Sequence, residues 1–273
     1  MQQYSVLMSV YKAEKADYLK QSMESIYNQT IPTSDFVLIC DGPLTQELDT
    51  VILEMQTKFG DVLHVIRLKE NVGLGQALNI GVLECKHDLI ARMDSDDISE
   101  AFRCEHELLA FQEHPDVSII GSVVGEFSST PDIIESKRVV PEKNEAIMTF
   151  AKKRNPFNHP SVMFKKNDVL AVGNYPPIRY IQDYYLWVTM LINGYKGYNV
   201  QEPLVLMRTN QALFKRRSGK FYIKLQLDLL KFMNQNNFIH KWEYIVFAAL
   251  RSISGLLPNR LRQYIFLNIL RKK

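Results

Sequence analysis

Three carboxylates stand close together at Asp94, Asp96 and Asp97, directly after a mostly apolar run at residues 89–93. Asp94 and Asp96 are two residues apart, so both side chains would project from one side of an extended strand. Their charges repel each other, and a bound divalent cation would relieve that repulsion. Mg²⁺ and Mn²⁺ take oxygen ligands from one or two carboxylates and leave other positions for the phosphates of a substrate. The spacing therefore indicates metal-assisted chemistry on a phosphorylated compound.

Arg92, shortly before these carboxylates, carries a planar guanidinium group of the kind that suits phosphate. A purely structural interpretation of the same stretch is also open. Asp-rich turns are common, and the side chain of Ser95 or Asp97 could cap a helix that begins near Ser99. The rest of the chain has to decide between the two interpretations.

A fourth carboxylate, Asp183, lies among aromatic residues near the start of a predicted helix that ends at Asn193. An acid in the first turn of a helix often only complements the helix dipole. Aromatic neighbours indicate a partly dry pocket, in which the pKa of a carboxyl group rises toward that of a useful general base. His159, in a loop that enters a strand, could contact metal, phosphate or an acceptor, although a lone histidine is more often a satisfied core residue.

The elements that must position these side chains alternate along the first part of the chain. We expect strands at residues 4–10, 36–40 and 63–68, with amphipathic helices at 17–29 and 45–59. Such alternation predicts parallel strands with right-handed crossovers, hence an open α/β sheet. Ligands bind beyond the carboxyl ends of the strands in such sheets. The residues expected at these ends are Tyr11, Asp41, Asn71 and Asp94.

A glycine-containing turn at residues 71–79 opens the next helix. Gly73 and Gly75 would let backbone N–H groups approach a ligand, and a helix N-terminus favours an anion. The same glycines could merely ease packing in a tight strand-to-helix turn. A dinucleotide-binding fingerprint fits poorly, because the third glycine is missing and the preceding strand is not the first.

The remaining chain is predicted to continue the alternation and then change in charge. Expected elements are a helix at 100–113, a strand at 117–124, a turn-rich excursion at 126–141, a helix at 142–153 and a strand ending near 164. Residues 208–273 hold 14 basic and two acidic residues, a net charge of +12, whereas residues 1–207 carry −9. This asymmetry indicates an acidic body followed by a basic tail, and the basic tail is expected to bind an anionic partner.

The basic tail contains a loop with Arg216 and Arg217, a helix at 220–233, and a stretch at 242–270 that Pro258 divides into two short amphipathic helices. A basic amphipathic helix with aromatic side chains on its apolar face can lie in a membrane interface, where anionic lipid attracts it. We therefore expect a membrane surface to be a partner of residues 242–273. Packing on the catalytic domain and a contact in a homo-oligomer are the open alternatives.

The amino-acid composition indicates the cellular compartment of the protein. The three cysteines are scattered and form no C-x-x-C pair, which favours a reducing compartment and argues against a disulfide framework or a zinc site. The N-terminus shows no secretory signal, and no apolar run approaches the roughly 18 residues that span a bilayer. A cytoplasmic protein, peripheral on the inner face of the cell membrane, is the expectation.

Six short motifs occur in an order and at intervals that resemble family 2 glycosyltransferases of bacterial capsule, exopolysaccharide and lipopolysaccharide synthesis. They are Ser9-Val10-Tyr11-Lys12, Cys40-Asp41-Gly42, Asn71-x-Gly73-x-Gly75-x-Ala77-x-Asn79, Arg92-Met93-Asp94-Ser95-Asp96-Asp97, Asn158-His159-Pro160-Ser161 and Gln182-Asp183-Tyr184. The resemblance implies a GT-A fold, a Rossmann-like open mixed sheet flanked by helices. It also implies a catalytic domain at 1–210, with a nucleotide-sugar half at about 1–100 and an acceptor half at about 101–210. A helical extension follows at 211–273.

The resemblance further implies inverting transfer from a nucleotide sugar, with UDP expected before GDP or dTDP, to a glycan or lipid-linked acceptor, with Mn²⁺ or Mg²⁺ as cofactor. On the donor side it assigns nucleoside contacts to Tyr11 and Asp41, nucleotide contacts to Asn71, Gly73 and Arg92, the ribose to Asp94, the metal to Asp96 and the diphosphate to Arg216 or Arg217. On the acceptor side it assigns the base to Asp183, with His159, Gln182, Tyr184 and Trp187 nearby. Two positions depart from the family pattern, since many relatives carry a second acid at the positions of Cys40 and Tyr185.

Two other classes of protein compete with this interpretation. A nucleotidyltransferase would also use an α/β sheet and acidic metal ligands, but its Gly-rich basic loop would follow the first strand, where this chain has no glycine. A basic-tailed nucleic-acid-binding protein is disfavoured for two reasons. The acidic body would repel a phosphate backbone, and the sequence shows no known motif for nucleic-acid recognition.

Overall fold

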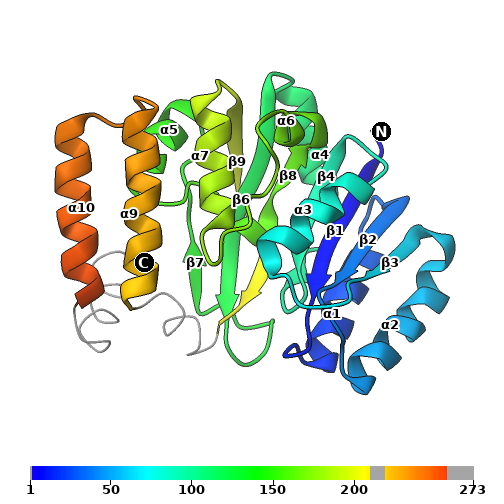
Figure 1. Ribbon diagram of the computed structural model, residues 1–273. Coiled ribbons are helices and arrows are strands. Elements are labelled where there is room, and N and C mark those ends of the chain that lie inside the picture. Colours follow the sequence, from blue (N-terminus) through cyan, green and yellow to red (C-terminus); the bar gives the residue numbers. More distant parts are fainter. Residues whose placement is uncertain (1, 210–218, 257–273) are drawn as a thin grey trace.

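Alternating strands and helices build the first half of the molecule in the computed structural model, which describes residues 2–209 and 219–256 (Figure 1). The elements are β1 (Tyr4–Val10), α1 (Ala16–Tyr27), β2 (Asp35–Cys40), α2 (Gln46–Phe59), β3 (Leu63–Arg67), α3 (Leu74–Glu84) and β4 (Leu89–Asp94). β1 pairs in parallel with β2 and β4, and β2 pairs in parallel with β3. The predicted parallel sheet with helical crossovers is confirmed.

The second half extends the same sheet with strands of both directions. Its elements are β5 (Ile98–Ser99), α4 (Arg103–Glu113), β6 (Val117–Phe127), β7 (Ser136–Arg138), α5 (Asn144–Ala151), β8 (Met163–Lys165), α6 (Lys166–Ala171), α7 (Gln182–Ile192) and β9 (Lys196–Arg208). Within the described part of the chain, the strand order is β3-β2-β1-β4-β8-β6-β9-β5, with β7 beside β6. β8 runs antiparallel to both β4 and β6, so the sheet is mixed, as expected.

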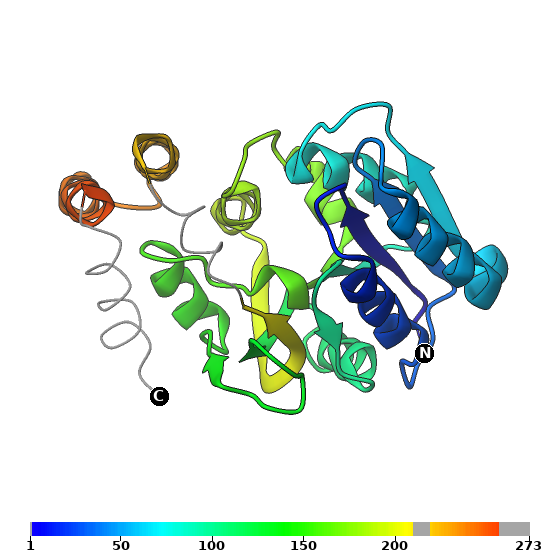
Figure 2. The ribbon, with the colours of Figure 1, turned by 90° about the horizontal axis from the view of Figure 1, so that it is seen from below.

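Helices cover both faces of the sheet because the strands are apolar on both sides (Figure 2). Side chains of α1, α2 and α4 form one core with one face of the strands. Side chains of α3, α5, α6, α7 and α9 form the other core. A sheet buried on both faces presents its ligand-binding surface at its edge, beyond the strand ends.

Two C-terminal helices, α9 (Lys220–Gln235) and α10 (Lys241–Leu256), lie side by side at the end of the molecule that is remote from β3 (Figures 1 and 2). The predicted helix at 220–233 and the first of the two predicted amphipathic helices are confirmed. The second one, beyond Pro258, lies outside the described residues, as do Arg216 and Arg217. Among the described helices, none has both the length and the apolarity needed to cross a membrane.

Two elements differ from the sequence expectations. The predicted helix at 100–113 is confirmed but begins later, at Arg103, because residues 98–99 pair with β9. β9 is not among the predicted strands, because polar side chains and Pro203 interrupt its apolar pattern. The sheet accommodates this irregularity by shifts of register on either side of Val123 in the neighbouring β6.

Candidate functional site

The carboxyl ends of β1, β2 and β4 meet at one edge of the sheet. Ser9 lies beside Asp94, and Val10 lies beside Cys40, in the two parallel pairings. Tyr11 and Asp41 therefore leave the sheet next to Asp94. Tyr11 is 44% exposed and can meet a ligand directly, whereas Asp41 is only 4% exposed.

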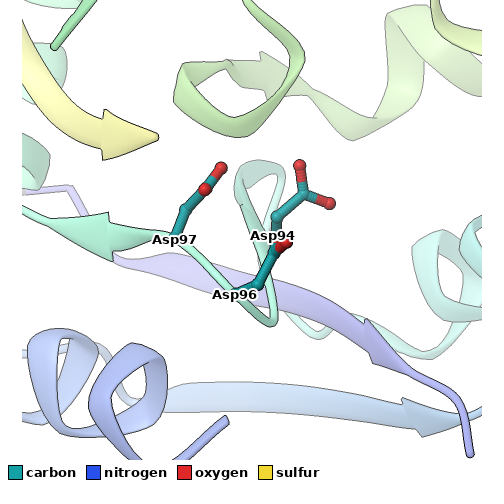
Figure 3. A group of neighbouring side chains, drawn as sticks. All are labelled: Asp94, Asp96 and Asp97. Carbon is teal, nitrogen blue, oxygen red and sulfur yellow. The ribbon is translucent and has the colours of Figure 1, made fainter. Parts of the chain in front are cut away.

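The three carboxylates after β4 form a cluster at this edge (Figure 3). Asp94, Asp96 and Asp97 each offer an oxygen atom, and the three atoms lie within 4.8 Å of one another. Asp94 ends β4, while Asp96 and Asp97 belong to the turn that leads into β5. The turn thus gathers three negative charges in a space the size of one cation with its ligands.

Electrostatics at the cluster disfavours three simultaneous negative charges. Burial, followed by the charges of Asp94 and Glu14, raises the pKa of Asp96 to about 7. Burial and the charges of Asp96 and Asp94 raise the pKa of Asp97 well above its ordinary value. A cation among these oxygens would remove the penalty, and carboxylate oxygens are the ligands that hard Mg²⁺ and Mn²⁺ prefer. The donor set therefore fits the divalent ion expected from the sequence.

Arg92 is buried and forms a bidentate pair with Asp94. Its side chain is 1% exposed, and both terminal nitrogens donate to Asp94, Nη1 to Oδ2 at 2.7 Å and Nη2 to Oδ1. A bidentate pair of this kind fixes the orientation of a carboxylate. In this structure the buried Arg92 orients Asp94, and its contact with a substrate phosphate stays a prediction.

Arg208, at the end of β9, is a site residue that the sequence analysis missed. Its main-chain N–H donates to Asp97 Oδ1 at 2.8 Å, and its Nε donates to the main-chain oxygen of Asp96 at 3.1 Å. The guanidinium lies 3.8 Å from the ring centre of Tyr18 and 4.6 Å from that of Phe127. Its separation in sequence from the cluster explains why no local motif indicated it.

The structure also decides against the helix-capping interpretation of the acidic turn. Asp97 accepts from β9, as described, and the Ser95 hydroxyl donates to Glu14 Oε2 at 2.9 Å. The residue that precedes α4 is Phe102, whose side chain makes no capping hydrogen bond. The acidic turn thus bonds to the edge of the sheet, and its side chains do not cap α4.

Asp41 organises the glycine turn before α3. Its carboxylate accepts from Asn71 Nδ2 at 2.9 Å, from the main-chain N–H of Val72 at 2.7 Å and from that of Gly73 at 3.1 Å. Gly73 takes a φ of +86°, a conformation that favours glycine. The visible role of Asp41 and Asn71 is to hold this turn against the end of β2.

Gly75, in the first turn of α3, lets the chain before α7 approach closely. A side-chain carbon built on Gly75 would lie 2.6 Å from the main-chain oxygen of Pro176 and 3.2 Å from Gln182 Cβ. Asn79 strengthens the same contact, since its Nδ2 donates to the main-chain oxygen of Tyr175 at 2.9 Å. The glycine motif therefore joins α3 to the segment that carries Asp183.

Asp183 lies in the first turn of α7 and is partly exposed. Asn155 Nδ2 donates to Asp183 Oδ2 at 2.7 Å, so a second loop orients this carboxylate. Nothing in the sequence singled out Asn155 as its partner.

Three of the four other acceptor-side residues are buried. Trp187 is fully buried, and Tyr184 is 5% exposed with its hydroxyl donating to the main-chain oxygen of Ala151 at 2.7 Å. Gln182 is 5% exposed. His159 is partly exposed and lies 3.0 Å from the Tyr175 hydroxyl, while burial and the charge of Arg92 lower the pKa of its ring well below the ordinary value. Tyr184 and Trp187 therefore support the fold behind Asp183.

Comparisons with known proteins agree with this geometry. The family model described as Glycosyl transferase family 2 matches residues 5–171. An Escherichia coli protein named UDP-Gal:alpha-D-GlcNAc-diphosphoundecaprenol beta-1,3-galactosyltransferase is 36% identical, over 98% of this chain and 97% of its own. The amylovoran biosynthesis glycosyltransferase AmsE of Erwinia amylovora is 33% identical, over 96% of this chain and 97% of its own.

Solved structures share the fold at low sequence identity. The S. aureus TarS fragment 1–349 in complex with UDP-GlcNAc superposes with a TM-score of 0.68 at 14% identity, over 98% of this chain and 76% of that one. The mannosyltransferase PcManGT from Pyrobaculum calidifontis, in complex with GDP-Man and Mn²⁺, gives a TM-score of 0.64 at 15% identity, over 99% and 81% of the two chains. At these identities the likeness establishes the GT-A fold alone.

Proposed function

The chain belongs to glycosyl transferase family 2 of bacterial polysaccharide synthesis, and from this premise we propose that it moves a sugar from a UDP-sugar to a hydroxyl of a lipid-linked acceptor, with inversion. The observation that carries the proposal is the cluster of Asp94, Asp96 and Asp97 at the edge of the sheet. The choice of UDP and of a lipid-linked acceptor draws on the E. coli relative, which is similar over nearly its whole length and is named for both.

On the donor side, Asp96 and its two neighbours would hold Mn²⁺ or Mg²⁺, and the bound cation would stabilise the charge that develops on the departing diphosphate. Arg92 keeps Asp94 oriented for that ion or for the ribose. Tyr11 and the turn held by Asp41 would contact the nucleoside. Arg216 or Arg217, which follow β9 in the sequence, would contact the diphosphate.

On the acceptor side, Asp183 would take the proton of the attacking hydroxyl. A single displacement by that hydroxyl inverts the configuration at the sugar carbon and needs no covalent intermediate with the protein. Asn155 holds the carboxylate in one orientation, which favours a productive approach. His159 and Gln182 would line the acceptor side. Residues 1–210 would then form the catalytic domain, and residues 211–273 an extension that reaches toward the cytoplasmic face of the membrane.

Calorimetric titration tests the donor site. UDP, GDP and dTDP are each added to the protein with Mn²⁺ and again with EDTA. We expect UDP to bind with Mn²⁺ and to bind much more weakly with EDTA. Metal-dependent binding of GDP or dTDP in its place would overturn the nucleotide assignment, and no binding of any of the three to folded protein would overturn the function.

A further inference from the structure

Helix α10 has two apolar faces, and only one of them is covered by the rest of the described chain. Tyr244, Phe247 and Ala248 pack inward against the core. Arg251 points the same way, with its Nη1 donating to the main-chain oxygen of Gln226 at 3.1 Å. These four residues recur at helical spacing and define the inner face.

The opposite face of α10 carries only uncharged side chains, all exposed. They recur at the same helical spacing and are Trp242, Ile245, Val246, Ala249, Leu250 and Ile253. Trp242 is 64% exposed, and Ile245, Leu250 and Ile253 are each close to 60% exposed, at 59%, 58% and 59%. A row of large apolar side chains over three turns is more than the scattered exposure usual on a soluble surface. We call these six residues the outer face.

We propose that the outer face of α10 is a docking surface for an anionic lipid bilayer, so that the helix lies in the plane of the membrane interface. The proposal rests on the proposed function, because a lipid-linked acceptor would be held at that same surface. A tryptophan at one end of an apolar stripe, with cations beside it, is the arrangement that binds helices to membrane interfaces.

Charge favours lipid as the occupant. From Lys241 to the C-terminus the sequence holds seven basic residues and one acid, Glu243. That acid is buried and lies 3.5 Å from Lys152 Nζ, on the protein side of the helix. The net positive charge of this part of the sequence disfavours contact with a second copy that carries the same charge, whereas anionic headgroups would attract it.

The inner face connects this surface to the proposed acceptor side. Arg251 Nη2 donates to the main-chain oxygen of Lys153 at 3.2 Å and lies 3.5 Å from the Tyr184 hydroxyl. Tyr184 follows Asp183 directly, and Asn155, two residues beyond Lys153, donates to Asp183. A bilayer on the outer face would therefore lie against α10, whose inner face contacts Tyr184 next to the proposed base. From that side, a sugar on a membrane-held lipid could reach the base.

Vesicle flotation of the full chain tests the proposal, with vesicles of phosphatidylcholine alone and of phosphatidylcholine mixed equally with phosphatidylglycerol. The test variant is Ile245→Glu/Leu250→Glu. The matched control is Leu53→Glu/Leu83→Glu, which adds the same charge at two equally exposed leucines, 63% and 57% exposed, on α2 and α3. Trp242→Ala serves as a milder second variant. Each protein is also titrated with UDP and Mn²⁺ and sized by light scattering.

We expect the unchanged chain and the control to float with the anionic vesicles, less so in high salt. The test variant should bind at least about tenfold more weakly, because two acids replace apolar anchors. Absence of flotation by protein that binds UDP, or equal flotation of test and control variants, would overturn the docking surface. A dimer lost in the test variant would assign the face to a second copy. Flotation without nucleotide binding would uphold the docking surface and overturn the proposed function.

Discussion

The main-chain N–H of Arg208 donates to Asp97 Oδ1 at 2.8 Å, which ties the end of β9 to the acidic turn after β4. The two residues are 111 positions apart in the sequence. The Arg208 side chain adds a second link, from Nε to the main-chain oxygen of Asp96. Strand β9 therefore sets the backbone position of two of the three clustered carboxylates.

The first prediction concerns this link. Arg208→Lys keeps the charge and the main-chain hydrogen bond but loses the planar group between Tyr18 and Phe127 and its Nε–H. Loss of a residue that hydrogen-bonds to a metal ligand typically lowers metal affinity about 10- to 100-fold. We expect Mn²⁺-dependent UDP binding, measured by calorimetry, to weaken by that order.

Arg67→Lys is the matched control for Arg208→Lys. Arg67 ends β3 and forms a surface ion pair with Asp49, with its side chain 49% exposed. The control should bind UDP like the unchanged protein, because surface pairs contribute little. Equal affinities for all three proteins would show that Arg208 does not position the cluster.

The second prediction separates the two assigned carboxylates. Asp96→Asn should weaken Mn²⁺-dependent UDP binding at least as much as the loss of an outer-shell partner, about 10- to 100-fold. Asp183→Asn should bind UDP normally and transfer sugar about 10²- to 10⁴-fold more slowly, the usual contribution of a general base. Full donor affinity in Asp96→Asn would contradict the metal role. An unchanged transfer rate in Asp183→Asn would contradict the base.

The third prediction concerns pH. Because the pKa of Asp96 is raised to about 7, a proton competes with the metal below that pH. Mn²⁺ affinity should fall about tenfold per pH unit below 7 and level off above it. In the metal-free protein, the free energy of unfolding changes with pH in the opposite direction to the Mn²⁺ affinity. The folded chain holds this proton longer than the unfolded chain, so this carboxyl makes the free energy of unfolding fall as pH rises from 3.8 to about 7.

Glu14→Gln tests the cause of this pH dependence without touching a proposed ligand. The charge of Glu14 is one of the influences that raise the pKa of Asp96. Its removal should move the midpoint of the Mn²⁺ affinity profile toward lower pH. Glu47→Gln, on the exposed start of α2, removes an equal charge elsewhere and should leave the midpoint unchanged. A common midpoint in all three proteins would contradict this account.

The sequence predicted the framework of the fold because its signals are local. Apolar runs of strand length and amphipathic helices could be recognised from period alone, and parallel strands must bring their carboxyl ends together. Tyr11, Asp41 and Asp94 were therefore placed correctly at one edge. β9 was missed because its polar residues and Pro203 lack that period, although pairing with β6 still orders it.

Side-chain partners could not be predicted in the same way. Arg92 suggests a phosphate ligand by type, and only the folded structure shows that its guanidinium donates to Asp94. The partners of Asp97 and Asp183 come from distant loops, at Arg208 and Asn155. Such contacts depend on how the loops pack in three dimensions, which leaves no period or motif in the sequence.

The fourth prediction concerns the close approach at Gly75. In a helix, alanine in place of glycine is favourable by about 1 kcal/mol from propensity alone. Here the added carbon would lie 2.6 Å from the main-chain oxygen of Pro176, and overpacking of this kind costs about 1–3 kcal/mol. We expect Gly75→Ala to lower the unfolding temperature and to slow sugar transfer, since the displaced segment leads into Asp183. Leu83→Ala, at the exposed end of α3, is the control, and a Gly75→Ala variant more stable than the unchanged protein would contradict the expected clash.

The fifth prediction concerns Asn155, which donates to Asp183 Oδ2 at 2.7 Å. Asn155→Ala removes this donor, so the carboxylate can turn away from the acceptor hydroxyl. Loss of orientation can slow a reaction by up to about a hundredfold. We expect kcat to fall toward that limit while UDP affinity stays unchanged. Asn167→Ala, an exposed amide on α6, should change neither quantity.

Asn155→Asp distinguishes orientation of the base from a merely structural role for the loop. It would place a second carboxylate beside Asp183, and two adjacent carboxylates do not both ionise readily. Proton acceptance by Asp183 would then require a higher pH, so the acid limb of the pH–rate profile should move upward. A structural defect alone would lower the rate equally at every pH. An unshifted profile in Asn155→Asp, together with normal kcat in Asn155→Ala, would show that Asp183 acts without this partner or is not the base.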